Sequence, residues 1–577
     1  MTLSVSGARW RLREVAQERV DALARAGALA PVVARCLVLR GVEKADEAAR
    51  FLTPRVADFH DPFAMKGMAA AVARIRQALS RREAVRVVTD YDVDGTTSSL
   101  IIQSVLGLLG ESPVSYHIPH RMEEGYGFSV AAAEQAVADA VGLIITADIG
   151  VRDSAAIGVA AAAGVDVLVL DHHLPRDAEV PAQALAVLCP PQRGCTYPNP
   201  HLAACGIAFK LAQALLADLG TGQREILEAS LLKMAAIGTV ADVVEMGRGE
   251  NRAMVALGLA ALNRGGHRPG LEALLEVAGC TPGTITAEDL GFKIGPRINA
   301  AGRLASAELV VNLLRCGDRA AARQMAEALD AMNRDRREVQ QVMVETALAE
   351  AEASADPFVV VAQAEGAGWH RGVAGIVAAR VRDSLHRPAA VITLCAKEAT
   401  GSMRSIAGVH AVRALDRAAH LLDRYGGHAV AAGFSLQADR IGELRAVLNA
   451  SALEQVGGTM PEPEREVDVQ LEASALGPTL LAQLDALAPH GKGNEVPVIW
   501  VPEVPRFRVE AMGEAHLRGT FCGGEGTEIP WVWFQGGEHL EALKEAREVA
   551  LLGRFQREWF RGQERQRFRV DDAAVLA

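Results

Sequence analysis

The run Val87-Val88-Thr89-Asp90-Tyr91-Asp92-Val93-Asp94-Gly95 places three aspartates at alternate positions directly after an apolar, β-branched stretch. Alternate side chains of a strand point to the same face, so we expect the three carboxylates to project together from a strand end. Hard divalent cations prefer oxygen ligands of this kind. The run therefore predicts a strand that ends in a metal site.

Two later strands are expected to end in the same way. Residues 143–147 (Leu-Ile-Ile-Thr-Ala) lead into Asp148, and residues 165–170 lead into Asp171-His172-His173. Ala-rich helical segments alternate with short apolar strands from about residue 84 to 215, which is typical of βαβ units and a parallel sheet. Ligands bind beyond the carboxyl ends of the strands in such sheets, which is where these side chains fall.

Each aspartate, taken alone, also fits a turn or a helix cap. The Asp-x-Asp-x-Asp-Gly pattern occurs in calcium-binding loops as well, but these need a glutamate at the twelfth position, where this chain has Ile101, and a preceding helix. Several ligand-type residues follow successive strand ends. A metal site explains this arrangement better than turn or helix capping does. Carboxylates with imidazole and without thiolate favour Mn²⁺ or Mg²⁺ over structural zinc.

Composition limits the class of protein. A length of 577 residues suggests several domains, and a net charge of −11 means that any contact with nucleic acid must come from a local groove or pocket. The eight cysteines form no Cys-x-x-Cys pair, which fits a reducing cytoplasm. We find no signal-peptide pattern and no apolar run approaching the ~18 residues of a membrane span. We therefore expect a soluble, cytoplasmic monomer.

Four blocks resemble the motifs of DHH-family phosphoesterases. They are residues 90–95 (Asp-Tyr-Asp-Val-Asp-Gly), 146–148 (Thr-Ala-Asp), 171–173 (Asp-His-His) and 238–242 (Gly-Thr-Val-Ala-Asp). Within that family, the chain resembles the single-strand-specific 5′→3′ DNA exonucleases. The blocks that carry this closer resemblance are residues 121–127, 295–303, 369–377, 426–433 and 490–494.

The resemblance implies an α/β fold, in which a parallel-sheet DHH domain and a DHH-associated domain are joined by a long helix and followed by a C-terminal OB-fold β-barrel. We expect these parts at residues 1–75 (an N-terminal helical segment), 76–317 (DHH domain), 318–355 (connecting helix), 356–456 (DHH-associated domain) and 457–577 (OB-fold domain). The chain ends soon after the last part, so we expect it to lack the further C-terminal domain of some relatives.

The resemblance also implies the reactive site. Two divalent ions, Mn²⁺ or Mg²⁺, would be held by Asp90, Asp92, Asp148, His172 and Asp242, with Asp148 as the bridge. Asp94 and His173 would then lie in the second layer or on the substrate. The predicted catalytic residues are accordingly Asp148, His172, His173 and Asp94. Asp171 either orients a histidine ring or caps the strand end.

A terminal 5′-phosphate needs a binding pocket, and forked guanidinium groups match its oxygens well. The candidates are Arg121, Arg303 and Arg404, to which the resemblance adds Ser402 from the segment 401–405, which we interpret as a loop. Three more candidates lie in segments also interpreted as loops and either contact the substrate or pack the lobes together: Arg297, Asn299 and His428.

The last part of the chain is rich in aromatic residues. Two roles remain open for them, stacking on bases or forming the barrel core. The residues concerned are Trp531, Trp533, Phe534, Trp559 and Phe560.

The predicted function is a single-stranded-DNA-specific 5′→3′ exonuclease that releases 5′-mononucleotides by two-metal-ion hydrolysis in recombination and DNA repair. The resemblance implies single-stranded DNA with a 5′-phosphate as substrate, and single-stranded-DNA-binding protein and a RecQ-type helicase as partners. A small-substrate DHH phosphoesterase acting on dinucleotides or cyclic dinucleotides is the alternative, which the length and the aromatic tail disfavour. A non-catalytic DNA-binding scaffold is disfavoured because all four acidic motifs are intact.

Overall fold

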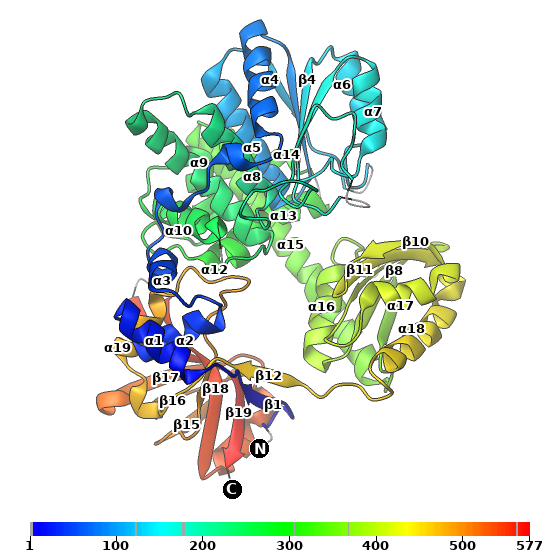
Figure 1. Cartoon of the computed structure of the whole chain (residues 1–577). Coiled ribbons are helices and arrows are strands. Elements are labelled where there is room, and N and C mark those ends of the chain that lie inside the picture. Colours follow the sequence, from blue (N-terminus) through cyan, green and yellow to red (C-terminus); the bar gives the residue numbers. More distant parts are fainter. Residues whose placement is uncertain are drawn as a thin grey trace. The chain divides into compact units, whose positions relative to one another are not determined.

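The computed structural model describes residues 4–121, 124–175, 179–247, 249–304, 306–366, 368–560 and 563–576. The chain divides into two compact units, the first made of residues 1–329 and 465–577 and the second of residues 330–464 (Figure 1). Helix α15 (Arg319–Glu352) runs from the first unit into the second, as the proline-free and glycine-free segment 318–354 predicts. Each unit is described by itself.

A parallel sheet of five strands forms the centre of the first unit's α/β part. The strand order is β3-β2-β4-β5-β6, and all neighbouring strands are parallel. In the register, Thr89 pairs with Ala147 and Ala147 pairs with Leu170, so β2, β4 and β5 end at one level. The strands are β2 (Val85–Thr89), β3 (Val114–His117), β4 (Leu143–Ala147), β5 (Asp166–Leu170) and β6 (Ala186–Leu188).

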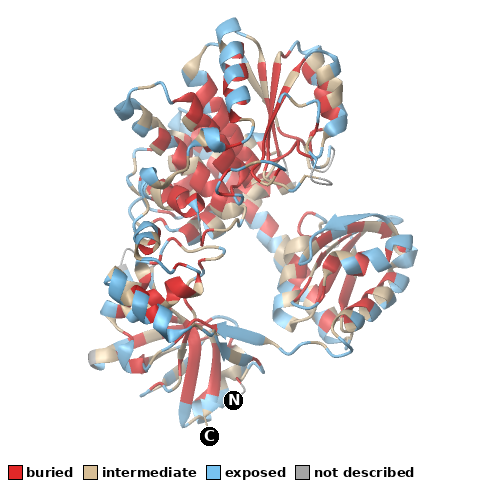
Figure 2. Ribbon diagram, viewed as in Figure 1, coloured by how far each residue is buried: buried red, intermediate tan, exposed pale blue. Residues whose placement is uncertain are grey.

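Helices cover both faces of this sheet, and most residues of β2, β4, β5 and β6 are therefore buried (red in Figure 2). Ile145 and Leu168 belong to a core shared with α4, α5, α8 and α9, whereas Ile144 and Val167 belong to a core shared with α6 and α7. The helices are α4 (Met68–Arg81), α5 (Val93–Leu109), α6 (Val130–Ala138), α7 (Ser154–Ala162), α8 (Ala204–Leu215) and α9 (Thr221–Ala241).

The helices that follow α9 complete this part of the unit. They are α10 (Glu250–Asn263), α11 (Pro269–Val277), α12 (Ala287–Asp289), α13 (Gly295–Leu304) and α14 (Glu308–Arg315). The interpretation of residues 295–303 as a loop is therefore wrong, because Arg297 and Asn299 lie in α13. Pro296 does not interrupt the helix, because it comes just after the π-helical turn Leu290–Ile294, where the regular hydrogen-bonding pattern already changes.

The N-terminal segment packs against the C-terminal sheet. Val20, Leu37 and Phe51 share a core with Phe521 and Trp531. The segment contains α1 (Gln17–Gly27), α2 (Pro31–Leu39) and α3 (Ala45–Leu52), and also a short strand, β1 (Arg9–Leu12), which pairs with β12 (Glu464–Val467). The expectation of a purely helical segment therefore missed one strand, which forms because a partner 455 residues further along the chain lies beside it.

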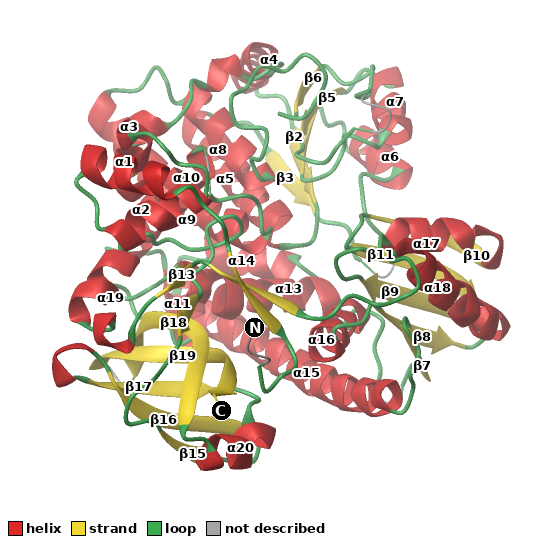
Figure 3. Cartoon of the chain, turned by 60° about the horizontal axis from the view of Figure 1, so that its bottom comes forward, coloured by secondary structure: helices red, strands yellow, loops and turns green. Residues whose placement is uncertain are grey.

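The C-terminal sheet has the strand order β13-β14-β18-β19-β17-β16-β15 (Figure 3). Its long hairpin pairs β18 with β19, and both ends of the chain meet beside it, because Ser6 and Trp10 donate hydrogen bonds to Asp572. The elements are β13 (Val469–Gln470), α19 (Pro478–Asp485), β14 (Ile499–Val501), β15 (Arg508–Met512), β16 (His516–Cys522), β17 (Glu528–Trp533), α20 (Leu540–Glu545), β18 (Glu548–Phe560) and β19 (Gln563–Leu576).

The second unit is built on a mixed sheet with the order β10-β11-β9-β8-β7, in which only β7 and β8 are parallel. Its elements are β7 (Val359–Ala364), α16 (Ala374–Leu385), β8 (Ala389–Cys395), β9 (Glu398–Arg404), α17 (Ala411–Arg417), β10 (Leu422–Gly427), β11 (Ala431–Gln437) and α18 (Ile441–Gln455).

Two segments of the second unit interpreted as loops are strands. Residues 401–404 belong to β9, and Gly426 and Gly427 belong to β10. Gly401 does not break β9 but makes room in the sheet, since a Cβ there would lie 2.1 Å from the ring of Phe434. His428 lies between β10 and β11, with Ala429 and Val430, as expected for a loop residue.

Across the described part of the chain, no single helix is both long and apolar enough to cross a membrane. Helices α1 and α2 reach that length only as a pair bent by 119°, and their apolar side chains lie in the core beside the C-terminal sheet.

The close packing of α9 gives a test of the fold. A Cβ at Gly238 would lie 2.4 Å from Thr97 Oγ1 and 2.5 Å from Cys205 Sγ, so Gly238→Ala must push α5 or α8 away. We expect this change to destabilise the protein by about 1–3 kcal/mol, seen as a lower thermal unfolding midpoint. Gly222→Ala, in the same helix with no atom within 4 Å of the added Cβ, is the control and should not lower it. Equal midpoints for the two variants would contradict the packing described.

Candidate metal centre

Three strand ends bring the centre's residues together. Asp90, Asp148 and Asp171 follow directly after β2, β4 and β5, which end at one level of the sheet. Asp92 caps α5 and accepts a hydrogen bond from the backbone N–H of Gly95 (3.1 Å). Gly95 is needed at this position because a Cβ would lie 2.4 Å from the Asp90 carbonyl oxygen. The start of α5 is thereby held against the end of β2.

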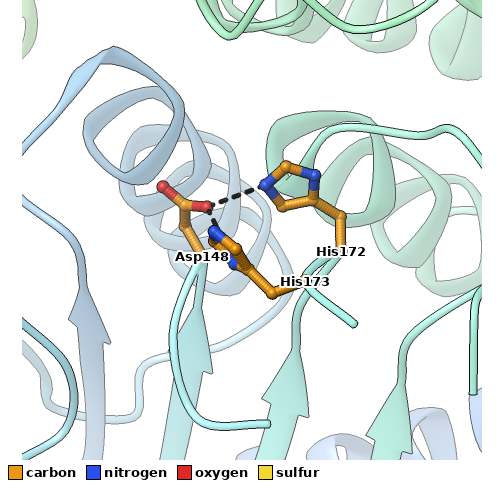
Figure 4. A group of neighbouring side chains, drawn as sticks. All are labelled: Asp148, His172 and His173. Atoms are coloured by element: carbon orange, nitrogen blue, oxygen red, sulfur yellow. Dashed lines mark ion pairs between the residues drawn. The ribbon is translucent and has the colours of Figure 1, made fainter. Parts of the chain in front are cut away.

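The side chains converge around His172. Its Nε2 lies 3.2 Å from Asp148 Oδ1 (Figure 4). The same atom lies 3.6 Å from Oδ2 of Asp242, the residue that directly follows α9. Three overlapping groups have ligand atoms within 4.8 Å of one another: Asp90-Asp92-Asp148, Asp148-His172-His173 and Asp94-His172-Asp242. The structure thus brings together all five predicted metal ligands, and Asp94 and His173 as well.

Four buried polar atoms in this cluster have no hydrogen-bond partner among the described residues: Asp90 Oδ1, Asp148 Oδ1, His172 Nε2 and Asp242 Oδ2. A buried polar atom left without a partner costs about 1–3 kcal/mol, and more when it is charged. Oxygen atoms with one imidazole nitrogen are the donor set that suits Mn²⁺ or Mg²⁺. The residues present therefore fit divalent ions, which would satisfy all four atoms.

Burial and mutual repulsion raise the pKa values of the carboxylates. Burial, with the charge of Asp92, raises the pKa of Asp90 to about 8. Burial, with the charges of Asp94 and Asp92, raises the pKa of Asp242 to about 9. The pKa of Asp148 is also raised, by burial and then by Asp92. Burial lowers the pKa of His172, which favours the neutral ring that a metal ligand requires. The centre is therefore arranged to take up cations.

Asp94 and His173 have partners of their own. The Asp94 carboxylate accepts hydrogen bonds from the N–H groups of Ala204 (2.7 Å) and Cys205 (2.8 Å) at the start of α8. His173 Nδ1 lies 2.7 Å from Asp171 Oδ1. Burial opposes the charged ring, but this hydrogen bond and the negative charge of Asp171 together outweigh burial and raise the pKa of His173. Asp94 thus anchors a helix, and Asp171 orients His173 rather than His172. Their predicted catalytic roles remain predictions.

The structure adds Tyr126 to the centre. Its hydroxyl donates a hydrogen bond to the Asp148 carbonyl oxygen (3.1 Å) and lies 3.4 Å from His173 Nε2, while its ring is largely exposed. Asp148 has a φ of 64°, a strained conformation that this bond helps to hold. The block 121–127 carries the family resemblance, but no local pattern in it indicates a role for Tyr126. Its neighbours Met122 and Glu123, from the same block, lie outside the described residues.

Two of the first unit's substrate candidates flank Tyr91, between the ligands Asp90 and Asp92. The Arg121 guanidinium lies 5.0 Å from the centre of the Tyr91 ring, and Arg303 is close enough to act on the pKa of the Tyr91 hydroxyl. Arg297 is placed differently. It is buried, and its guanidinium donates hydrogen bonds to the carbonyl oxygens of Lys293 (2.7 Å) and Val277 (3.1 Å). Of its two predicted roles, packing suits this arrangement better than substrate contact.

In the second unit, Ser402 and Arg404 lie together at the start of α16. Arg404 Nη1 donates to Ser402 Oγ (3.2 Å), and a Cβ on Gly375 would lie 3.0 Å from both Arg404 Nη2 and Ser402 Oγ. Burial lowers the pKa of Arg404. A helix N-terminus with a fixed guanidinium and a hydroxyl can bind an anion.

The aromatic residues of the C-terminal sheet divide between the two roles left open. Trp531 and Trp533 are buried, and Trp531 stacks on Phe507 at 5.2 Å, so these two form core. Phe534 is 45% exposed, with the Arg569 guanidinium 5.6 Å from its ring centre. The side chains of Trp559 and Phe560 lie outside the described residues.

Three family models match this chain. The DHH family N-terminal domain matches residues 84–239, the DHHA1 domain matches residues 356–454, and the RecJ OB domain matches residues 467–572. These matches confirm the predicted fold class, including the C-terminal OB domain. The exact domain boundaries remain predictions.

Whole-chain similarity points to one group of enzymes. The chain is 35% identical over 577 residues to the single-stranded-DNA-specific exonuclease RecJ of Bacillus subtilis (strain 168), a match that covers 98% of this chain and 71% of that protein. A crystal structure of RecJ in complex with Mn²⁺ from Thermus thermophilus is similar, with a TM-score of 0.82 and 28% identity over 99% of this chain and 80% of that one. The structure of that RecJ with Mg²⁺ gives a TM-score of 0.76, with 27% identity over 99% of this chain and 79% of that one.

Proton competition gives a test of the centre. Because the pKa values of Asp90 and Asp242 are raised to about 8 and about 9, a divalent ion must displace protons when it binds below that range. We expect the affinity for Mg²⁺ to rise about tenfold per pH unit for each proton displaced between about pH 6 and 9. Isothermal titration calorimetry in buffers of different ionisation enthalpy measures the Mg²⁺ affinity and the number of protons released on binding.

The raised pKa values of Asp90 and Asp242 also determine how pH changes the stability of the metal-free protein. Because these two carboxyls have higher pKa values in the fold than the ~3.9 of an unfolded chain, the metal-free protein loses stability as the pH rises from about 4 until it passes about 8 to 9. The increase in thermal unfolding midpoint on adding Mg²⁺ should therefore grow with pH. An affinity and a midpoint increase that are both independent of pH would contradict the assignment.

Proposed function

The chain belongs to the RecJ exonucleases of the DHH family, and on this basis we propose that it degrades single-stranded DNA in the 5′→3′ direction, releasing 5′-mononucleotides in recombination and DNA repair. The cluster of unpartnered ligand atoms on Asp90, Asp148, His172 and Asp242 carries the proposal. It lies beyond the carboxyl ends of a parallel sheet, where open α/β folds bind their substrates.

Asp90, Asp92, Asp148, His172 and Asp242 would hold two divalent ions, Mn²⁺ or Mg²⁺. When bound, such ions activate a water molecule and neutralise charge on the leaving oxygen, so no protein nucleophile is required. Asp148 would contribute to holding both ions, because its carboxylate belongs to two of the three ligand groups. Tyr126 and the Asp171–His173 pair position Asp148 and the second histidine, and Asp94 holds α8 in place.

The 5′-phosphate would bind to guanidinium groups. In the second unit, Arg404 and Ser402 beside the start of α16 form a compact anion site. In the first unit, Arg121 and Arg303 flank Tyr91. Asn299 and His428 are further candidates for contact with the substrate, whereas the buried Arg297 would pack α13 against α11.

The family suggests the oligomeric state, the compartment and the partner proteins. We propose that the enzyme acts as a monomer in the cytoplasm and works with single-stranded-DNA-binding protein and a RecQ-type helicase. The eight free cysteines suit a reducing compartment.

Labelled oligonucleotides test the proposed reaction. With Mn²⁺, a 5′-labelled single strand should release labelled mononucleotide at once, a 3′-labelled one should shorten progressively, and EDTA or a blunt duplex should prevent both. Asp148→Asn should lower kcat about a thousandfold, equivalent to about 4 kcal/mol of barrier, because it weakens the bridging ligand. The control is Asp218→Asn, an exposed aspartate paired with Arg76, which should keep wild-type activity. Turnover of dinucleotides without cleavage of long strands would instead favour a small-substrate phosphoesterase.

The anion site makes a separate prediction. Wild-type protein should have a higher kcat/KM for 5′-phosphorylated than for 5′-hydroxyl strands. Arg404→Ala should reduce that ratio by about 10- to 100-fold, the equivalent of one charge-assisted contact of about 1.5–3 kcal/mol. Arg417→Ala, an exposed arginine of the same unit paired with Glu454, should leave the ratio unchanged. An unchanged ratio in Arg404→Ala would remove this residue from the pocket.

A further inference from the structure

A turn from the C-terminal part of the chain lies directly against the segment that follows Asp242. The turn, residues 490–494, leads from α19 toward β14. The backbone N–H of Met246 donates to the Lys492 carbonyl oxygen at 2.7 Å, and a Cβ on Gly247 would lie 2.2 Å from the Gly493 carbonyl oxygen. The two backbones thus approach each other as closely as glycine allows.

The turn is held rigidly in this position. Gly491 and Asn494 exchange backbone hydrogen bonds (3.0 and 2.9 Å), and the Asn494 side chain donates to the carbonyl oxygens of Leu487 and Pro489 (2.8 Å each). The buried Arg40 donates to Asn494 Oδ1 at 2.6 Å. Gly493 has a φ of 74°, and a Cβ there would also overlap the Glu245 carboxylate, so glycine is needed for both reasons. So many constraints on one turn fix the direction of the residue between its glycines, Lys492.

Lys492 is exposed and forms no ion pair or side-chain hydrogen bond with the residues that the structure describes, yet its ammonium acts electrostatically on Asp242 and lowers the raised pKa of that carboxyl. The Asp242 side chain is 21% exposed, against 4% for Asp148 and none for Asp94. The turn that carries Lys492 therefore packs against the segment after Asp242, the carboxylate of the three that is most exposed.

A positive charge beside the metal centre would favour the binding of DNA. The carboxylates of Asp90, Asp92, Asp94, Asp148 and Asp242 would carry more negative charge than two divalent ions offset, so cationic side chains near the centre favour the approach of a DNA phosphate. Positive charge near the centre raises the local concentration of an anionic substrate. An ammonium without a carboxylate partner among the described residues is available for a phosphate oxygen.

We infer that Lys492 binds a backbone phosphate of the DNA strand at the metal centre, as a substrate-positioning residue supplied by the turn 490–494. This inference rests on the proposed exonuclease function. It adds a contact from the C-terminal part of the chain to a centre whose metal ligands all come from residues 90–242.

The salt dependence of cleavage tests it. A lost contact to a single-stranded phosphate should reduce the slope of log(kcat/KM) against log[salt] by about 0.7. We expect Lys492→Ala to show this smaller slope together with a KM raised about five- to tenfold, and Lys492→Arg to restore both. Lys544→Ala is the matched control, an exposed lysine of the C-terminal part paired with Glu541, and should behave as wild type.

Other outcomes would separate a failure of the assignment of Lys492 from a failure of the proposed function. A wild-type slope in Lys492→Ala would overturn the inference, as would a loss of Mn²⁺ affinity in that variant, because Lys492 would then act through the metal site. If the wild-type protein itself cleaves no single strand in the same assay, the proposed function fails, and not the assignment of Lys492 alone.

Discussion

Mutual repulsion among buried carboxylates governs the arrangement of side chains at the carboxyl ends of β2, β4 and β5. The register of β2, β4 and β5 brings Asp90 and Asp148 to one edge of the sheet, and α9 adds Asp242. Concentrating like charges away from water is unfavourable unless cations offset it, as the raised pKa values of Asp90 and Asp242 record. The fold tolerates this arrangement because it is built to hold divalent ions.

The surroundings of the centre keep it rigid without neutralising it. Gly95 and Gly238 let α5 and α9 approach the strand ends and each other, and Asp94 fixes the start of α8 through two backbone N–H groups. None of these contacts uses the unpartnered ligand atoms of the centre. The turn containing Lys492 reaches the same place from the other end of the sequence, so the centre is completed by residues far from its motifs.

The sequence predicted those structural features that depend on residues near one another in the chain. Apolar runs ending in Asp90 and Asp148 indicated a parallel sheet with a site at its edge, and the helix over residues 319–352 followed from the lack of proline and glycine. The segments around Ser402 and Arg297 were interpreted as loops, although they form a strand and a helix, and the role of Gly401 depends on a distant neighbour, the Phe434 ring. The contact of Asp94 with α8, the pairing of β1 with β12 and the approach of Lys492 to Asp242 join distant residues, which no local pattern encodes.

Anomalous X-ray scattering from crystals grown with Mn²⁺ would show whether these residues hold two ions. We expect two anomalous peaks, ligated by Asp90, Asp92, Asp148, His172 and Asp242, with Asp148 touching both ions. No peak within this cluster, or a single ion bound without Asp148, would contradict this expectation.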